Sequence, residues 1–270
     1  MIQCEDGGQS LIVPGNFPQT FVNCGGVYQC PLGSDGKPIG FLAGCAGKYL
    51  VSNAALAVTE VPGRAGPLIN TSSHSSHYVT PAYYNFSMAD RYPAVLRHTA
   101  RLLAMDIRQR ELKPTVILGA PMAGIKVSGA LAEELGCLGI FAEKKVLAAP
   151  NQAQRALSQL RLERYSLQSN DRVLICEDVV NNFSTTRELV GLVRAAGAEV
   201  IGISSVINRA FPVSTEFDGY PVMSIWPVPT PEYRQEDPLV SEAVQARRVI
   251  WDPKKKENWR RLIEEMNTSV

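Results

Sequence analysis

Two adjacent carboxylates, Glu177 and Asp178, follow a run of four apolar residues at 173–176. A segment rich in small hydroxyl and amide side chains comes next, and a helical pattern begins after it. Carboxylates accept hydrogen bonds from ribose hydroxyls, while loop N–H groups and a helix N-terminus bind phosphate. The pattern therefore favours a clamp for a sugar phosphate. The alternative is that Asp178 and residues 181–185 only cap a helix, which accounts for one or two polar residues but not for the whole string.

A second loop, residues 119–124, has a glycine at each end and follows a short apolar run. Pro121 stands where a dinucleotide-binding fingerprint requires its second glycine, and proline has no backbone N–H to donate. The loop also lacks the Gly-Lys-Ser/Thr ending of a nucleotide P-loop. The loop is therefore neither a dinucleotide-binding fingerprint nor a nucleotide P-loop.

The elements that must position these loops alternate between strand and helix. Such alternation predicts a parallel sheet with helices on its faces, and the loops at the strands' carboxyl ends then gather on one edge, where ligands bind. The sequence predicts strands at 116–118, 139–142, 172–177 and 199–207, helices at 91–107, 125–135 and 186–196, and a loop at 178–185.

Three regions differ in composition: a β-rich N-terminal extension, an α/β core and a charged C-terminal extension, at residues 1–69, 70–228 and 229–270. Ser34-Asp35-Gly36 predicts a hairpin in the first region. The last region is expected to end in an amphipathic helix with Trp259 and Leu262 on one face. Residues 147–160 are interpreted as a mobile surface loop or a short helix.

The chain has 270 residues, of which 45% are hydrophobic and 20% charged, and its formal net charge is +1. This composition excludes disorder, collagen and a coiled coil as the main character of the chain. With no bulk charge we expect no nucleic acid or anionic membrane as partner. Without a run of about 18 apolar residues or a signal-peptide pattern, we expect no membrane span and a cytoplasmic protein.

Other chemical signals are weaker. Six cysteines are too sparse for a disulfide scaffold, and Cys137 and Cys176 lie in apolar stretches typical of small buried side chains. His74 and His77 have metal-pair spacing, but no third ligand lies nearby. The aromatic residues within 78–86 are expected to pack rather than to stack on a base.

The string 173–186 resembles the ribosyl-pyrophosphate binding motif of type I phosphoribosyltransferases, in which an apolar strand is followed by Glu-Asp, two apolar residues and Thr-Thr-Gly-x-Ser/Thr. Three other stretches resemble the orotate phosphoribosyltransferase branch. Residues 72–79 look like its Ser-Gly-x-x-Ser-x-x-Tyr segment, 116–125 like its pyrophosphate loop, and 140–145 like the strand that enters its catalytic loop. The resemblance covers residues 70–210 and implies an α/β, Rossmann-like phosphoribosyltransferase core.

This resemblance implies a magnesium-dependent enzyme that transfers 5-phosphoribosyl from phosphoribosyl pyrophosphate to a pyrimidine base, with orotate as the expected base. It also implies a homodimer in which one subunit's loop reaches the other's site. Two alternatives stay open: a non-catalytic sensor that binds ribose phosphates or nucleotides, and transfer to a purine base.

The resemblance also assigns roles to residues. Glu177 and Asp178 would hold the ribose hydroxyls, stabilise a cationic sugar and contact Mg²⁺ indirectly, through ribose and pyrophosphate. Lys144 would act on pyrophosphate, and residues 147–160 would close the site. The expected substrate-binding residues are Ala120, Pro121, Met122, Ala123, Gly124, Lys145, Arg164, Asn181, Asn182, Phe183, Ser184, Thr185 and Thr186.

The chain departs from the family pattern at several positions. Phe183 replaces the loop glycine, and Asn181 and Asn182 replace two threonines. We expect the Phe183 ring to turn away from phosphate, while the two asparagines adopt the unusual backbone angles that the glycine normally takes. Lys144 alone matches the basic residues of the mobile loop, and Arg164-Tyr165 stands where the orotate branch has Arg-Gly.

Overall fold

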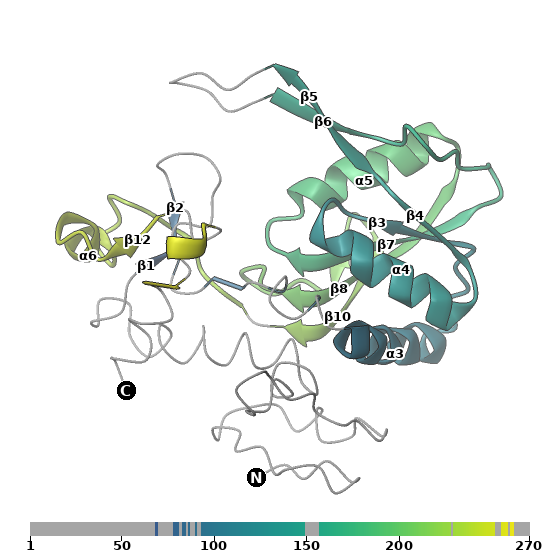
Figure 1. Cartoon of the computed structure of the whole chain (residues 1–270), viewed down its shortest axis with the longest axis horizontal. Helices are drawn as coiled ribbons and strands as arrows, with labels where there is room; N and C mark the ends of the chain where they lie inside the picture. The colour runs from purple at the N-terminus through teal and green to yellow at the C-terminus, as the bar shows by residue number, and fades with distance from the viewer. Residues whose placement is uncertain are drawn as a thin grey trace, which may run out of the picture.

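A six-stranded sheet forms the centre of the molecule, in the strand order β4-β3-β7-β8-β10-β9 (Figure 1). All neighbouring strands are parallel except β9, which runs antiparallel to β10. The predicted parallel α/β sheet is therefore confirmed. The strands are β3 (Val116–Gly119), β4 (Leu138–Phe141), β7 (Arg172–Val180), β8 (Glu199–Asn208), β9 (Glu216–Phe217) and β10 (Tyr220–Pro227). This computed structural model describes residues 68–69, 78–80, 83–84, 86, 90, 93–148, 157–227, 229–251, 255–258 and 260–261.

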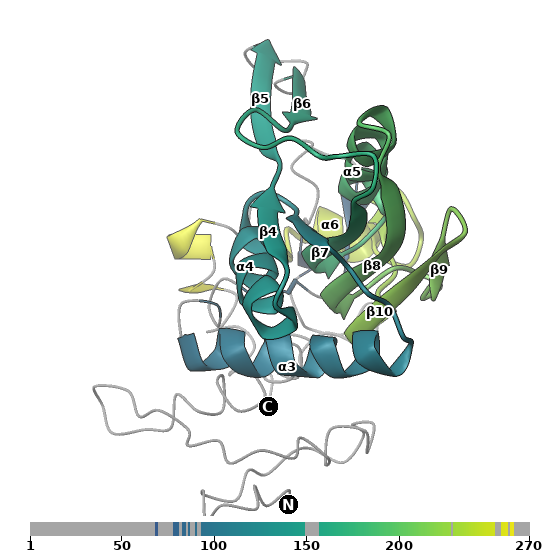
Figure 2. The same ribbon diagram turned by 90° about the vertical axis from the view of Figure 1, so that its right-hand side faces the viewer.

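Helices cover both faces of the sheet: α3 (Pro93–Gln109) and α4 (Ala123–Leu135) pack on one face, and α5 (Ser184–Ala195) packs on the other (Figure 2). Each central strand is buried on both sides, and its side chains alternate between the two cores. On β7, Leu174 and Cys176 join the core under α3 and α4, whereas Val173 and Ile175 join the core under α5. Near the end of β7 this order changes, because Val179 packs against the core under α3 and α4 while Val180 lies in the core under α5.

The helix predictions agree with the structure to within two residues at each end. The helix expected at 91–107 spans Pro93–Gln109, and its buried stripe includes Leu103 and Ile107. The helix expected at 125–135 begins at Ala123 and stops where predicted, because Gly136 takes the left-handed backbone with φ of 69°. Cys176 is fully buried, as expected of a small apolar side chain, whereas Cys137, for which the same was expected, is only half-buried at the edge of the core.

The loop predicted at 178–185 is wrong in length. Strand β7 continues to Val180, because Val179 and Val180 pair with the last two residues of β8. Helix α5 begins at Ser184, so only residues 181–183 connect strand and helix. Asp178 therefore lies within the sheet ladder and not in a loop.

A two-stranded antiparallel hairpin, β5 (Glu143–Ala148) and β6 (Leu157–Arg161), follows β4 directly and extends beyond the sheet (Figures 1 and 2). Its base is fixed to α5, because Leu160 is buried in the core there and its backbone N–H donates to the Glu188 carboxylate at 3.3 Å. The expected loop or short helix at 147–160 is thus corrected at both ends, where the residues are strand. Residues 149–156 lie outside the described part.

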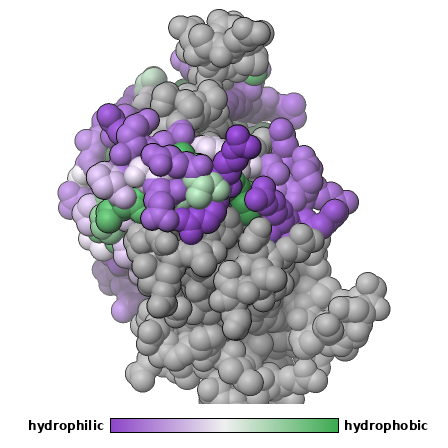
Figure 3. Space-filling model, turned by 90° about the vertical axis from the view of Figure 1, so that its left-hand side faces the viewer, coloured by the Kyte–Doolittle hydropathy of each residue, from purple (hydrophilic) through white to green (hydrophobic). Residues whose placement is uncertain are grey.

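A smaller unit, which we call the terminal subdomain, joins short segments from before and after the core. Strand β1 pairs with β12 and β2 pairs with β11, around a small core that includes Val79, Val240 and Val249. On the face that Figure 3 shows, which is the left-hand side of Figure 1, the surface of the described residues is largely hydrophilic. The elements of the terminal subdomain are β1 (Leu68–Ile69), β2 (Tyr78–Val79), β11 (Tyr233–Arg234), α6 (Ser241–Gln245) and β12 (Val249–Ile250).

Several predictions concern residues that the structure describes only in part. The hairpin at Ser34-Asp35-Gly36, the pair His74 and His77, and the side chains of Trp259 and Leu262 lie outside the described residues. In the aromatic segment 78–86, Tyr84 and Phe86 are buried in the core, as expected of packing residues, whereas Tyr78 is exposed and departs from that expectation. Among the described helices, none is long and apolar enough to cross a membrane.

Candidate active site

The connection between β7 and α5 is three residues long, and its last residue has an unusual backbone. Phe183 takes the left-handed conformation, with φ of 58° and ψ of 18°. The asparagines before it have no positive φ, so the expectation that Asn181 or Asn182 would adopt this conformation is wrong. The tight turn requires the left-handed conformation at residue 183, where the family motif has glycine, because the helix begins at the next residue.

The ring of Phe183 packs away from the loop into the core beneath α5. It stacks on Phe217 of β9, with ring centroids 4.7 Å apart and planes 9° from parallel. The Arg187 guanidinium lies over the other aromatic ring of this pair, 5.2 Å from the Phe217 centroid. Burial and stacking offset the roughly 1–2 kcal/mol that a left-handed backbone costs a residue with a Cβ. The expectation that the ring turns aside is confirmed.

Glu177 is buried against the first turn of α5. Its side chain accepts a short hydrogen bond from the Thr186 hydroxyl, and both residues are almost fully buried. Burial raises the pKa of the Glu177 carboxyl to about 7; the Thr186 hydrogen bond lowers that pKa, and the nearby Asp178 charge raises it. The carboxyl therefore titrates close to neutral pH in the ligand-free protein.

Asp178 follows on the same strand and is half-buried. Glu177, by contrast, is almost fully buried on the α5 side of the sheet, where it bonds Thr186. The two carboxylates of the motif thus have different surroundings. Asp178 is the more accessible of the two.

The second loop, residues 120–122, packs directly against the carboxylate strand. The Ala120 N–H donates to the Cys176 carbonyl at 2.9 Å. A Cβ on Gly124 would lie 2.9 Å from that same carbonyl and 3.3 Å from the Glu177 Cα, so only glycine allows the first turn of α4 this close to β7. The structure therefore brings the 120–124 loop, the carboxylates and the 181–183 turn to one edge of adjacent strands.

Exposure differs along the 120–124 loop. Ala120 and Gly124 are buried, Pro121 and Ala123 are half-buried, and Met122 is 83% exposed. Helix α4 begins at Ala123 beside this edge, and within its first turn the Ile125 N–H donates to the Met122 carbonyl at 3.3 Å. The first N–H groups of a helix have no acceptor four residues earlier in the chain and can bind an anion.

The polar residues of the 181–186 segment have different partners. The Asn182 side-chain oxygen accepts the Ser184 N–H at 3.1 Å, and the Asn181 side-chain nitrogen donates to Glu232 at 2.7 Å. The Thr186 hydroxyl is used by Glu177, whereas Ser184 is exposed and Thr185 half-buried. Binding of phosphate by these side chains stays a prediction.

The predicted basic residues lie on and below the β5–β6 hairpin. Lys144 is exposed on β5, and Lys145 pairs with Glu163 at 3.0 Å. Arg164 pairs with Glu143 at 2.8 Å, and 70% of its side chain is exposed. Their roles toward a ligand stay predictions.

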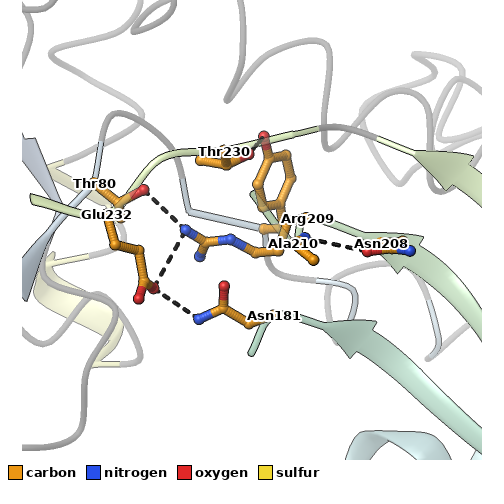
Figure 4. A network of polar contacts seen from close by, with 8 residues as sticks. Thr80, Asn181, Asn208, Arg209, Ala210, Thr230 and Glu232 are labelled. Carbon is orange, nitrogen blue, oxygen red and sulfur yellow. Dashed lines mark hydrogen bonds and ion pairs between the residues drawn. The ribbon is translucent and has the colours of Figure 1, made fainter. Parts of the chain in front are cut away.

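Sequence reasoning missed a buried polar network at the carboxyl end of β8 (Figure 4). Arg209, 4% exposed, donates to the Thr80 hydroxyl at 2.8 Å and lies 3.7 Å from the Glu232 carboxylate. Its guanidinium also lies 5.5 Å from the centre of the Tyr84 ring. Tyr84 in turn hydrogen-bonds Thr230 at 2.8 Å. A single arginine after a strand gave no signal, because its partners are distant in the sequence.

Comparison with known families gives a match to the phosphoribosyl transferase domain over residues 87–224. This is just over half of the chain and includes both loops and the carboxylate string. The chain belongs to this family. The resemblance to type I phosphoribosyltransferases is thereby confirmed.

Curated relatives of this phosphoribosyltransferase-family chain carry the name orotate phosphoribosyltransferase. The protein of Caldanaerobacter subterraneus is 27% identical over 188 residues, which are 68% of this chain and 88% of the relative. The protein of Carboxydothermus hydrogenoformans is 26% identical over 129 residues, 47% of this chain; the chain spans only 62% of that relative's length.

Solved structures of other phosphoribosyltransferases are also similar to this family member. UMP synthase of Leishmania donovani has a TM-score of 0.48 at 21% identity, over 85% of this chain and 43% of that one. Adenine phosphoribosyltransferase of Rhodothermus marinus has a TM-score of 0.43 at 22% identity, over 54% of this chain and 87% of that one.

A resident metal centre finds no support among the described residues of this phosphoribosyltransferase, because no three His, Cys, Asp or Glu side chains there lie close enough to hold an ion. Mg²⁺ commonly binds through one or two carboxylates together with substrate phosphates. Asp178 and Glu177, beside the start of α4, fit a Mg²⁺ ion that arrives with a pyrophosphate.

Proposed function

We propose that the chain transfers a 5-phosphoribosyl group from phosphoribosyl pyrophosphate to a pyrimidine base, with orotate as the leading candidate, and releases pyrophosphate. The observation that carries the proposal is the meeting of three elements at one sheet edge: the 120–124 turn, the carboxylates of β7 and the 181–183 turn. The family match and the orotate relatives support it.

The reaction passes through a cationic sugar, so the site must hold the ribose and stabilise positive charge rather than supply a strong base. Asp178, the more accessible carboxylate, would accept hydrogen bonds from the ribose hydroxyls and stabilise the cation. Glu177, bonded to Thr186, would fix the start of α5 beside it. The 5′-phosphate would bind N–H groups at the N-terminus of α5 and would replace the Asn182 oxygen as the acceptor of the Ser184 N–H.

The leaving pyrophosphate would bind the N–H groups of the 120–124 turn. When bound, Mg²⁺ would neutralise pyrophosphate charge, with Asp178 and Glu177 contributing through ribose and pyrophosphate. Lys144 and Lys145 of the β5–β6 hairpin would add positive charge when the hairpin covers the site. Because pyrophosphate gains charge as it leaves, these cations would act most strongly in the transition state.

Two arginines are candidates for recognising the carboxylate of an acidic pyrimidine. Arg164 is largely exposed and already paired with Glu143. Arg209 is buried at the carboxyl end of β8, and its closest carboxylate partner, Glu232, is 3.7 Å away. A buried guanidinium with a loose ion pair has donors left for a ligand, which favours Arg209.

We also propose that the enzyme works as a cytoplasmic homodimer, as the family resemblance implies.

The alternative of a non-catalytic sensor was suggested by Phe183, which stands in the loop expected to bind phosphate. The Phe183 ring lies in the core beneath α5, away from the phosphate-binding N–H groups, and this weakens the steric argument for the sensor.

The test is a turnover assay with phosphoribosyl pyrophosphate, Mg²⁺ and a panel of orotate, uracil, adenine and hypoxanthine. Orotate-dependent release of pyrophosphate, absent in Asp178→Asn, is the expected result. Release only with a purine would move the proposal to the purine alternative. Tight binding of phosphoribosyl pyrophosphate without turnover on any base would favour the sensor.

A further inference from the structure

Glu232 is the one described residue whose carboxylate contacts both the sugar-phosphate turn and the buried arginine. Its Oε1 accepts the Asn181 side-chain N–H at 2.7 Å and lies 3.7 Å from the Arg209 guanidinium (Figure 4). Asn181 is the first residue after β7, and Arg209 is the first after β8. One oxygen therefore joins the ends of two neighbouring parallel strands.

The carboxylate comes from outside the core. Glu232 immediately precedes β11, which pairs with β2 in the terminal subdomain. Thr80, which follows β2, bonds the same Arg209 nitrogen that faces Glu232. A residue next to each strand of this small sheet thus contacts Arg209. The pairing of β11 with β2 positions Glu232, in addition to its own hydrogen bond.

The arrangement is constrained at each end. Arg209 is buried, its backbone N–H donates to the Val180 carbonyl at 2.8 Å, and its carbonyl accepts the Thr230 N–H at 3.2 Å. Burial lowers the pKa of the Arg209 guanidinium, and the Glu232 carboxylate counteracts this. At the other end, Asn181 begins a turn of only three residues, which ends at the left-handed residue Phe183.

We propose that Glu232 is a positioning residue for phosphoribosyl transfer, which holds Asn181 and Arg209 in one arrangement and so couples the sugar-phosphate turn to the terminal subdomain. The inference rests on the proposed function, because its effect is on the binding of phosphoribosyl pyrophosphate. Glu232 acts through Asn181 and Arg209 and needs no contact with the substrate.

A purely structural role predicts something different. If Glu232 only docks the terminal subdomain, its removal lowers the melting temperature but leaves the affinity of folded protein for phosphoribosyl pyrophosphate unchanged. If it positions the turn, KM for that substrate rises even well below the melting temperature. Its effect is then also not additive with that of Asn181, since both changes break the same hydrogen bond.

The experiment compares five proteins: wild type, Glu232→Ala, Glu232→Gln, Asn181→Ala and the Asn181→Ala/Glu232→Ala double variant. Glu236→Ala, an exposed carboxylate in the same segment, is the matched control. Melting temperature, kcat and the KM for phosphoribosyl pyrophosphate are measured for each, together with calorimetric binding of that substrate with Mg²⁺.

We expect Glu232→Ala and Asn181→Ala each to raise KM about tenfold, equal to about 1.4 kcal/mol, with a smaller change in kcat. The KM of the double variant should be no higher than that of the single variant with the higher KM. Glu232→Gln keeps an oxygen that accepts from Asn181, so its KM should return to within about threefold of wild type. Because Glu232→Gln and Asn181→Ala preserve most of the network, they test the proposal even if Glu232→Ala does not fold.

An unchanged KM in Glu232→Ala and Asn181→Ala, with a lower melting temperature, overturns the inference and leaves the proposed function standing. Additive KM effects in the double variant also overturn it. Wild-type protein that neither binds nor turns over phosphoribosyl pyrophosphate overturns the proposed function, and the inference with it.

Discussion

At the scale of single residues, the two neighbouring carboxylates of β7 differ in their surroundings. Glu177 is buried and bonded to Thr186, whereas Asp178 is half-buried. The sequence suggests two equivalent ligands for ribose. Their difference in burial instead favours different tasks for the accessible carboxylate and the buried one.

The first prediction follows from the buried carboxyl. The folded-state pKa of Glu177 is raised from 4.5 to about 7, so burial favours its neutral form. Its contribution to stability is fully present below about pH 4.5 and is lost as pH rises toward 7. Relative to Glu177→Gln, the ligand-free wild type should lose stability between about pH 5 and pH 8, on the order of 3 kcal/mol.

Urea unfolding of both proteins at the two pH values measures this difference. Glu177→Gln keeps an oxygen that accepts from Thr186, so it isolates the charge. Parallel pH profiles for wild type and variant would show that the carboxyl does not titrate in this range.

The second prediction concerns Asp178. If this carboxylate stabilises the cationic sugar, Asp178→Asn should lower kcat/KM at least about a hundredfold, or roughly 2–3 kcal/mol. Glu177→Gln should have a smaller effect. Steady-state kinetics would check which of the two variants loses more kcat/KM. The control is Glu199→Gln, which changes an exposed carboxylate at the opposite end of the sheet. A larger loss in Glu177→Gln would reverse the assignment.

At the scale of elements, the 181–183 turn is supported by an edge strand from elsewhere in the chain. Phe183 has a backbone typical of glycine, and its ring is stacked on Phe217 of β9. The two features belong together, because a left-handed residue with a large side chain persists only when its surroundings stabilise it. The turn therefore separates backbone shape, which the proposed function assigns to the ligand, from side-chain packing.

The third prediction tests that separation. Phe183→Gly should keep turnover within about tenfold of wild type, since the loop N–H groups stay in place. It should lower stability by about 2 kcal/mol, because the lost ring burial exceeds the relief of backbone strain. Phe217→Ala, which removes the stack but leaves the turn sequence intact, is the control. A hundredfold loss of turnover in Phe183→Gly alone would show that the ring shapes the site.

The fourth prediction concerns the β5–β6 hairpin. Lys144→Ala should lower kcat more than it raises KM for phosphoribosyl pyrophosphate, because charge on the leaving group grows in the transition state. Lys145→Ala, which removes a lysine already paired with Glu163, should have the smaller effect on kcat. A change confined to KM would contradict a role for Lys144 in the transition state.

At the scale of the whole molecule, local patterns predict the core better than its attachments. The order of strands and helices, the stop at Gly136 and the two loops follow from apolar runs and glycines in short windows. The β5–β6 hairpin was missed because its described strands have no clear alternation of polar and apolar residues. Strand β7 is longer than predicted because its pairing with β8 decides where it ends.

The network around Arg209 could not be predicted for a related reason. Thr80, Asn181, Arg209 and Glu232 come from four separate parts of the chain, and the Thr80–Arg209 hydrogen bond spans 129 positions. Each residue alone is an ordinary polar residue after a strand or before one. Only the pairing of β2 with β11 and the parallel order of β7 and β8 bring them together.

This network links the terminal subdomain to the core, which leads to the last prediction. Arg209→Met fills most of the space but leaves Glu232 and Thr80 without their cationic partner. We expect a loss of about 2–3 kcal/mol in stability, since an uncompensated carboxylate is left partly buried. Urea unfolding with Arg97→Met, an exposed arginine on α3, as control measures this loss.

The same variant should open the terminal subdomain before the core unfolds. Residues 229–251 should therefore become more sensitive to protease in Arg209→Met, while the cores on both sides of the sheet stay protected. Mass spectrometry of the first fragments would locate the cuts. If Arg209→Met unfolds in a single step with the same first cuts as wild type, the terminal subdomain is held by its own strand pairs and apolar core, and the arginine serves the ligand alone.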